Sequence, residues 1–141
     1  MAEKSKSCVH IAVGIIVNTE CSMIFITQRS GKAPNGNLWE FAGGKVEVNE
    51  TVEQAVYREL KEEVGINVKM AEPFISLIKN CSDKILAVDF FLITSFEGEP
   101  FGNEGQIGFW VPVSKLSELK FPEANKPVLD KLVARFCESL N

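Results

Sequence analysis

The chain has few of the residues that build metal–thiolate and disulfide sites. Its 141 residues contain one histidine, His10, and four cysteines that form no Cys-x-x-Cys pair. Zinc sites need several Cys or His ligands at short spacings, and disulfide frameworks are typical of small secreted chains. Scattered thiols are typical of a reducing compartment. We therefore expect a cytoplasmic protein without structural zinc.

Long apolar runs and an excess of positive charge are also missing. No apolar run approaches the roughly 20 residues of a membrane-spanning helix, so no membrane partner is expected. The apolar run Val9–Val17 is not followed by the small-residue cleavage site of a signal peptide. With 15 basic and 19 acidic residues, the formal net charge is −4. This balance argues against direct nucleic-acid binding, which usually needs a basic stripe.

What remains is a globular composition, 45% hydrophobic and 24% charged, without repeats or linkers. A chain of this length fits one domain, residues 1–141, which buries roughly two-thirds of its unfolded surface. Short apolar segments rich in β-branched residues predict strands. These segments are Val9–Val17, Met23–Gln28, Leu38–Phe41, Glu72–Lys79, Ile85–Thr94 and Ile107–Val111, with a helical turn at Ser114–Leu119.

Two helices complete the prediction, one at Thr51–Val64 in mid-sequence and one at Pro127–Leu140. In the first helix an apolar residue recurs at every fourth position, and Gly65 follows as a stop signal. Thr51 and Gln54 have the spacing of a capping box at its start. The fold class is therefore mixed α/β (α+β), with a sheet that carries two helices.

Three carboxylates gather near the end of the first helix. At 100° per residue, Glu59, Glu62 and Glu63 lie within about 100° of one another on one face. Like charges at this spacing destabilise a helix, and the macrodipole disfavours anions at its C-terminus. A solvated surface helix is one explanation. The neighbouring apolar stripe and the Gly43-Gly44 turn favour another, a site for Mg²⁺ or Mn²⁺ that acts on phosphates.

These residues are part of a longer motif. The segment Gly44-x5-Glu50-x7-Arg58-Glu59-Leu60-x-Glu62-Glu63-x-Gly65-Ile66 resembles the complete Nudix box, with every fixed position filled. Further segments resemble the MutT branch of that family, whose members are 8-oxo-dGTP diphosphatases. They are Ile11–Ile16, Ile24–Thr27, Glu40–Phe41, Gly98–Pro100, Glu104–Gln106 and Phe121–Asn125.

The resemblance implies a Nudix-type α/β/α sandwich, with a mixed sheet between the Nudix-box helix and the C-terminal helix. It also implies Mg²⁺-dependent attack of water on a nucleoside triphosphate, here 8-oxo-dGTP, which releases 8-oxo-dGMP and pyrophosphate. Such an enzyme cleans the nucleotide pool, binds a small-molecule nucleotide and is expected to be a monomer. Mn²⁺ is an alternative cation.

By motif position, the resemblance assigns the metal ligands and the catalytic groups. The metal ligands are Gly44, Glu59, Glu62, Glu63 and Glu104. The general base stays open among Glu59, Glu63 and Glu104. An ion pair between Arg58 and Glu50 would orient the carboxylates, and the cation of Lys45 would neutralise phosphate oxygens.

The resemblance further implies a base-binding residue, Asn125. An asparagine offers both a donor and an acceptor, so it can sense the N7–H that guanine gains on oxidation at C8. Asn125 also precedes Lys126-Pro127, which makes it an N-cap candidate for the last helix. The remaining substrate-binding residues by resemblance are Arg29, Phe41, Val9, Ile11, Leu86 and Lys84.

Some positions depart from the branch. Ala42 replaces an expected proline, Cys81 an aromatic residue, Lys84 an arginine, and Asp89 an apolar or aromatic residue. These departures concern the base pocket rather than the carboxylates. Two rival functions therefore stay open: a Nudix hydrolase for another nucleotide, such as ADP-ribose or an unmodified dNTP, and a non-catalytic module that binds damaged bases.

Overall fold

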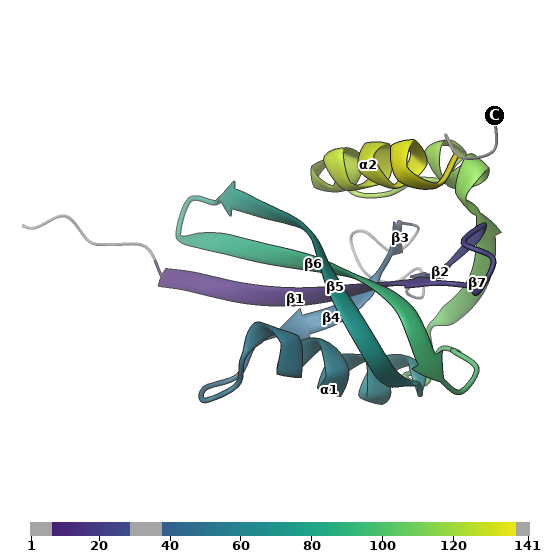
Figure 1. Cartoon of the computed structure of the whole chain (residues 1–141). Helices are drawn as coiled ribbons and strands as arrows, with labels where there is room; N and C mark the ends of the chain where they lie inside the picture. The colour runs from purple at the N-terminus through teal and green to yellow at the C-terminus, as the bar shows by residue number, and fades with distance from the viewer. Residues whose placement is uncertain (1–6, 29–37, 138–141) are drawn as a thin grey trace, which may run out of the picture.

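The computed structural model describes residues 7–28 and 38–137 and contains one mixed sheet of seven strands (Figure 1). The strands are β1 (Ser7–Val17), β2 (Met23–Gln28), β3 (Trp39–Glu40), β4 (Ala42–Lys45), β5 (Asn67–Asn80), β6 (Lys84–Glu97) and β7 (Ile107–Pro112). The main path runs β3-β2-β1-β6-β5, with β4 paired to β1 and β7 paired to β2.

The central strand β1 organises the sheet. It runs parallel to β6, whereas all other pairings are antiparallel. On its other edge β1 pairs with two strands in turn. Residues 11–14 pair with β4, and Ile16 and Val17 pair with β2. Gly43 and Gly44, in the middle of β4, are thereby held directly against the centre of the sheet.

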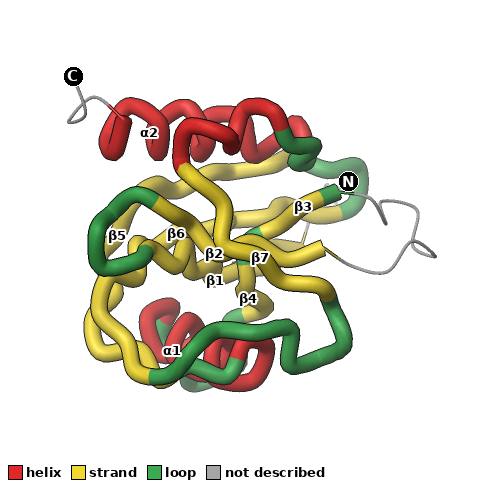
Figure 2. Tube along the Cα trace, turned by 90° about the vertical axis from the view of Figure 1, so that its right-hand side faces the viewer, coloured by secondary structure: helices red, strands yellow, loops and turns green. Residues whose placement is uncertain are grey.

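Two helices cover opposite faces of the sheet, α1 (Val52–Val64) below and α2 (Lys126–Cys137) above in the view of Figure 1. Figure 2 shows the same three layers after a quarter turn. The Thr51 side chain accepts from the Gln54 backbone N–H while Gln54 accepts from Thr51 N–H, which completes the predicted capping box. Gly65 ends α1 with φ of 71°, a left-handed conformation that glycine adopts without strain. The predicted α/β/α sandwich is confirmed.

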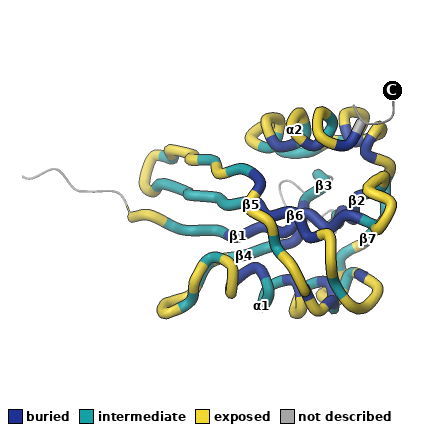
Figure 3. Tube along the Cα trace, viewed as in Figure 1, coloured by how far each residue is buried: buried dark blue, intermediate teal, exposed yellow. Residues whose placement is uncertain are grey.

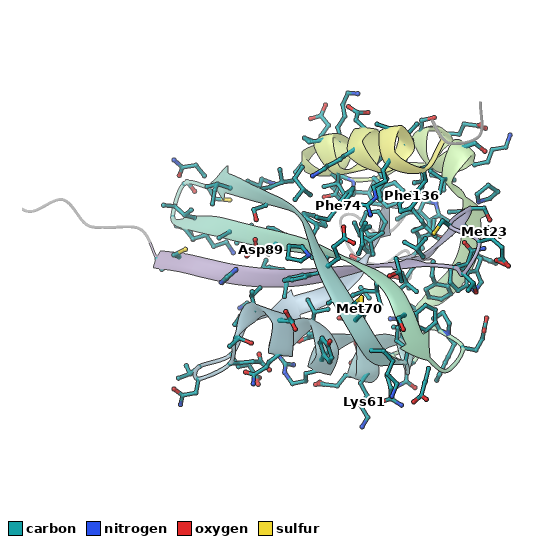
Figure 4. All side chains as sticks on the ribbon, in the orientation of Figure 1. Met23, Lys61, Met70, Phe74, Asp89 and Phe136 are labelled. Carbon is teal, nitrogen blue, oxygen red and sulfur yellow. The ribbon has the colours of Figure 1, made fainter. Side chains whose placement is uncertain are left out.

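The core lies in two layers, because the side chains of each strand alternate between the faces. One layer packs against α2 and includes Phe74 and Phe136, which lie between the sheet and that helix in Figure 4. The other packs against α1 and includes Leu60 and Val64. Figure 3 shows that the buried residues concentrate where sheet and helices face each other, while the β5–β6 tip is largely exposed.

Most predicted elements lie within a few residues of their observed bounds. Strand β4 is the main omission, because the sequence predicts a turn at Gly43-Gly44, whereas Ala42–Lys45 form a strand. The helical turn near residue 114 is a 3-10 helix, Val113–Glu118, and a second one spans Glu123–Asn125. None of the helices in the described part of the chain is long and apolar enough to cross a membrane.

Candidate active site

Two carboxylates of α1 lie against strand β4. A Cβ atom added to Gly44 would lie 2.5 Å from the carboxyl group of Glu59, so a larger residue there would displace that group from its position. The neighbouring Gly43 donates its backbone N–H to Glu63 Oε2 at 3.1 Å. The Nudix-box helix and the glycine turn thus bring Gly44, Glu59 and Glu63 together, as the sequence predicted.

The environment of these carboxylates opposes full ionisation. Burial raises the pKa of Glu63 well above its usual range, and a hydrogen bond to Glu59 and the negative charge of Glu59 raise it further. The charge of Glu104, on the exposed loop after β6, acts in the same direction, while the hydrogen bond from Gly43 opposes it. Two acidic groups this close share a proton unless a cation takes its place.

The third candidate ligand on the helix, Glu62, shares the Arg58 guanidinium with Glu59. Glu62 accepts from Arg58 Nη1 at 3.2 Å, and its side chain is half exposed. Among residues 7–28 and 38–137, no three carboxylate, histidine or cysteine side chains are gathered around one point. The atoms near Gly44 that could coordinate a cation are nevertheless all oxygens, and the carboxylates among them carry excess negative charge. This donor set fits a hard divalent cation, and Glu62 would have to leave Arg58 to join it.

Arg58 donates hydrogen bonds to several of the surrounding carboxylates. Its Nε and Nη2 donate to the two carboxylate oxygens of Glu50 at 2.7 and 3.0 Å, which is the predicted ion pair. It also donates to Glu59 at 2.8 Å and to the backbone carbonyl of Lys45 at 3.0 Å. The guanidinium therefore ties the end of β4 to the carboxylate face of α1.

The pKa values reflect this pairing. Hydrogen bonds from Arg58 and from the backbone N–H of Glu47 hold the pKa of Glu50 at about 2, against an ordinary 4.5. The same bond to Glu50 raises the pKa of Arg58 above its already high ordinary value. Glu50 is therefore ionised, and Arg58 charged, throughout the physiological range.

We expect Glu50→Gln to destabilise the fold at neutral pH, because Arg58 loses its bidentate partner. A carboxyl group with a lowered pKa stabilises the folded state above its unfolded pKa and loses that contribution as the pH falls through its folded pKa. The stability difference between wild type and E50Q should thus be constant near pH 7 and narrow below about pH 4.5. Urea unfolding between pH 7 and pH 3 measures it. A difference independent of pH would contradict the assigned pairing.

A cavity of about 340 Å³ reaches Gly43 and Gly44, the two residues that adjoin the carboxyl groups of Glu63 and Glu59. Five predicted site residues line it: Ile11, Phe41, Gly44, Lys45 and Asn125. The other lining residues were not predicted: Val13, Glu40, Gly43, Val88, Phe90 and Pro122. The sequence pattern could have identified three of them. Side chains alternate along a strand, so Val13 lies on the same face as Ile11, and Val88 and Phe90 are their partners on the neighbouring strand β6.

Three predicted substrate-binding residues lie outside this cavity. Val9 and Leu86 pair with each other one step further along the face that carries Ile11. Lys84 is exposed at the start of β6, opposite Ser7. Their assignment to substrate binding stays a prediction. Arg29 falls outside the described residues.

Aromatic rings form one wall of the cavity. Phe41 stacks on Phe121 with ring centroids 5.2 Å apart and meets Phe90 edge-on at 6.5 Å. Asn125 lies at the end of the second 3-10 helix, directly before α2. Within the described residues its side chain makes no hydrogen bond, so the alternative role as a side-chain N-cap is not observed. Its amide therefore remains available to a ligand.

Asp89, the most unusual departure, lies away from the cavity, because strand alternation places it on the face of β6 that packs against α1. It contacts His10 Nε2 at 2.5 Å and accepts from the hydroxyl of Ser76. Burial raises the pKa of Asp89, but these hydrogen bonds outweigh it and hold the pKa below its ordinary value. Asp89 is thus a paired structural carboxylate, and it does not alter the cavity wall.

Comparison with known proteins agrees with this geometry. The model of the NUDIX domain matches residues 9–132. The chain is 48% identical to the 8-oxo-dGTP diphosphatase of Escherichia coli over 86% of this chain and 94% of that protein. The chain is 41% identical to the 8-oxo-dGTP diphosphatase of Haemophilus influenzae, over 91% of this chain and 93% of that protein.

A solved structure of MutT, from work on Aliivibrio salmonicida and Vibrio cholerae, superposes with a TM-score of 0.84. It is 45% identical and covers 92% of this chain and 100% of its own. The residues matched by the family model include the carboxylate helix α1 and the two glycines of β4. The chain belongs to the Nudix hydrolase family.

Proposed function

We propose that this protein hydrolyses 8-oxo-dGTP to 8-oxo-dGMP and pyrophosphate with the help of a divalent cation, Mg²⁺ or in its place Mn²⁺. One observation carries the proposal. A single cavity is lined at one point by Asn125 and at another by Gly44 and Lys45, which adjoin the carboxylates of α1. A nucleobase and its phosphates can therefore bind in one continuous site. The relatives named 8-oxo-dGTP diphosphatase support this substrate.

The proposed cation ligands are the backbone carbonyl of Gly44 and the carboxylates of Glu59, Glu62, Glu63 and Glu104. When bound, the cation supplies charge neutralisation for phosphate oxygens and lowers the pKa of a bound water. Burial and the neighbouring Glu59 raise the pKa of Glu63 when no cation is bound, so cation binding should release a proton from Glu63 to the solvent.

The surrounding residues prepare the site. Arg58 fixes the position of Glu59 and of the Lys45 backbone, while Glu50 holds Arg58 in place. The Lys45 side chain is exposed at the cavity and makes no ion pair with a described residue, so its ammonium can neutralise phosphate oxygens as charge develops. Glu59, Glu63 and Glu104 are the candidates for taking the proton of the attacking water.

In the proposed binding mode the base lies against Phe41 and meets Asn125. The apolar side chains of Ile11, Val88 and Phe90 exclude water from this part of the cavity. An asparagine that makes no other hydrogen bond in the described structure can donate to O6 and accept from N7–H of 8-oxoguanine. Unmodified guanine has an acceptor at N7, and this second hydrogen bond is lost.

Product identification tests the reaction class. We expect 8-oxo-dGTP, Mg²⁺ and the protein to yield 8-oxo-dGMP and pyrophosphate in equal amounts, with none formed in EDTA. The substrate panel should include ADP-ribose and CTP, because the chain is also 32% identical to a CTP pyrophosphohydrolase of Escherichia coli over 82% of that protein. Faster turnover of CTP than of 8-oxo-dGTP, or release of orthophosphate, would contradict the proposal.

We further propose that residues 1–141 act as one domain and as a monomer on free nucleotides in the cytoplasm. The net charge of −4 supports a nucleotide over a nucleic-acid partner. Gel filtration at micromolar concentration, with and without nucleotide, should give a mass close to 15.6 kDa.

A further inference from the structure

The C-terminus of α1 is completed by a loop about forty residues further along the chain. The last turn of a helix leaves carbonyl groups without partners inside the helix. Here Lys61 O accepts from Gly65 N–H at 3.2 Å, but the next three carbonyl groups accept from the loop 101–106. Phe101 N–H donates to Val64 O at 3.1 Å.

Two side-chain amides of this loop reach the helix directly. Asn103 donates its Nδ2 to Glu62 O at 2.8 Å and its backbone N–H to Glu63 O at 2.9 Å. Gln106 donates its Nε2 to Glu63 O at 3.3 Å. The loop thus binds the backbone of the two residues whose side chains are proposed cation ligands.

Gln106 makes a second hydrogen bond that links the helix to Glu104. Its Oε1 accepts from the backbone N–H of Glu104 at 2.9 Å. One amide group therefore bridges Glu63 O on the helix and Glu104 N–H on the loop. The turn beneath it is tight, because a Cβ on Gly102 would lie 1.7 Å from the carbonyl oxygen of Gln106 and Gly105 has φ of 87°.

We propose that Gln106 is a positioning residue that holds Glu104 against the carboxylate face of α1. This inference rests on the proposed function, in which Glu104 is a cation ligand. Glu104 itself is exposed and is the one proposed carboxylate ligand that α1 does not carry. Without the bridge, the loop would keep its contacts through Phe101 and Asn103, but the backbone of Glu104 would lose its link to the helix.

A double-mutant cycle with Glu104 tests this inference. Gln106→Met keeps the length of the side chain and removes both hydrogen bonds. We expect Q106M to weaken Mn²⁺ binding, followed by electron paramagnetic resonance without nucleotide, by about tenfold, as for other groups that orient ligands. The kcat should fall by a similar factor, while KM stays within about twofold. In an E104Q background Q106M should add less than about a twofold effect, because the carboxylate it positions is gone.

The control is Lys115→Met, an equally large polar-to-apolar change at an exposed residue of the Val113–Glu118 helix. It should change neither Mn²⁺ binding nor kcat. If Q106M does not fold, Gln106→Glu removes only the donor to Glu63 O and takes the place of Q106M in the double-mutant cycle. Equal effects of the Gln106 change in both backgrounds, or no effect, would overturn the inference and leave the proposed function standing. An E104Q variant that binds Mn²⁺ normally would overturn both the inference and the assignment of Glu104 as a cation ligand, whereas the proposed hydrolysis is tested separately by its products.

Discussion

Glu59→Gln is expected to lower kcat by roughly three orders of magnitude while the fold is retained. The carboxyl group of Glu59 lies over Gly44, beside Glu63, and accepts from Arg58 at 2.8 Å. An amide of the same shape fills this space but removes the negative charge that attracts the cation. Steady-state kinetics with saturating nucleotide and Mg²⁺ measures the loss, with circular dichroism as the check on folding.

Glu53→Gln is the matched control for this prediction. This variant makes the same acid-to-amide change in the same helix, but Glu53 lies in the first turn and is exposed. E53Q should therefore keep nearly full activity. Activity of E59Q within about tenfold of wild type would contradict the placement of the cation at Gly44.

The same variant has a second expected property. Because Glu59 raises the pKa of Glu63, E59Q should lower that pKa. A carboxyl group with a raised folded pKa stabilises the fold fully below its unfolded pKa and loses that contribution as the pH rises through its folded pKa, for Glu63 about 8. Without metal, the melting temperature of E59Q should thus fall less between pH 5 and pH 8 than that of wild type.

Asn125→Ala is expected to remove most of the preference for the oxidised base. Asn125 is half-buried at the cavity, and its side chain has no hydrogen-bond partner among the described residues that would have to be replaced. Loss of two hydrogen bonds to the base should lower kcat/KM for 8-oxo-dGTP by roughly 5- to 150-fold, since each contributes about 0.5–1.5 kcal/mol net. The value for dGTP should change much less.

Asn125→Asp separates the two hydrogen bonds. Aspartate keeps an acceptor for N7–H but loses the donor to O6, so N125D should also bind the oxidised base poorly. Melting temperatures show whether either variant acts through the start of α2 instead. An N125A enzyme with unchanged discrimination would contradict the assignment of Asn125 to the base.

The parts of the fold with strong local signals could be predicted from the sequence. The capping box of Thr51 and Gln54 and the stop at Gly65 define α1 within one residue. Strand β4 could not be predicted in this way, because Gly43 and Gly44 have low strand propensity and become a strand only by pairing with β1. Strand β5 begins at Asn67, before the predicted Glu72, in a stretch of mixed polar and apolar residues whose register shifts twice.

The residues of the site likewise differ in whether a local sequence pattern predicts them. The metal-ligand candidates on α1 are fixed by helical spacing, so Glu59 and Glu63 meet as expected. The cavity depends on which strand residues face it and how far along the strands it extends. Alternation could have identified Val88, but only the three-dimensional structure shows that Val9 and Leu86 lie beyond the cavity. The bridge formed by Gln106 joins segments 43 residues apart, and no local pattern predicts it.

The central claim is that one cavity selects the oxidised guanine nucleotide and presents its phosphates to the carboxylates of α1. The most direct measurement is the ratio of kcat/KM for 8-oxo-dGTP to that for dGTP, at the same Mg²⁺ concentration and with pyrophosphate as the product measured. The account predicts a ratio of about 100 or more, since a site that hydrogen-bonds its substrate strongly disfavours an analogue lacking the matching group. Equal values for the two nucleotides would contradict it.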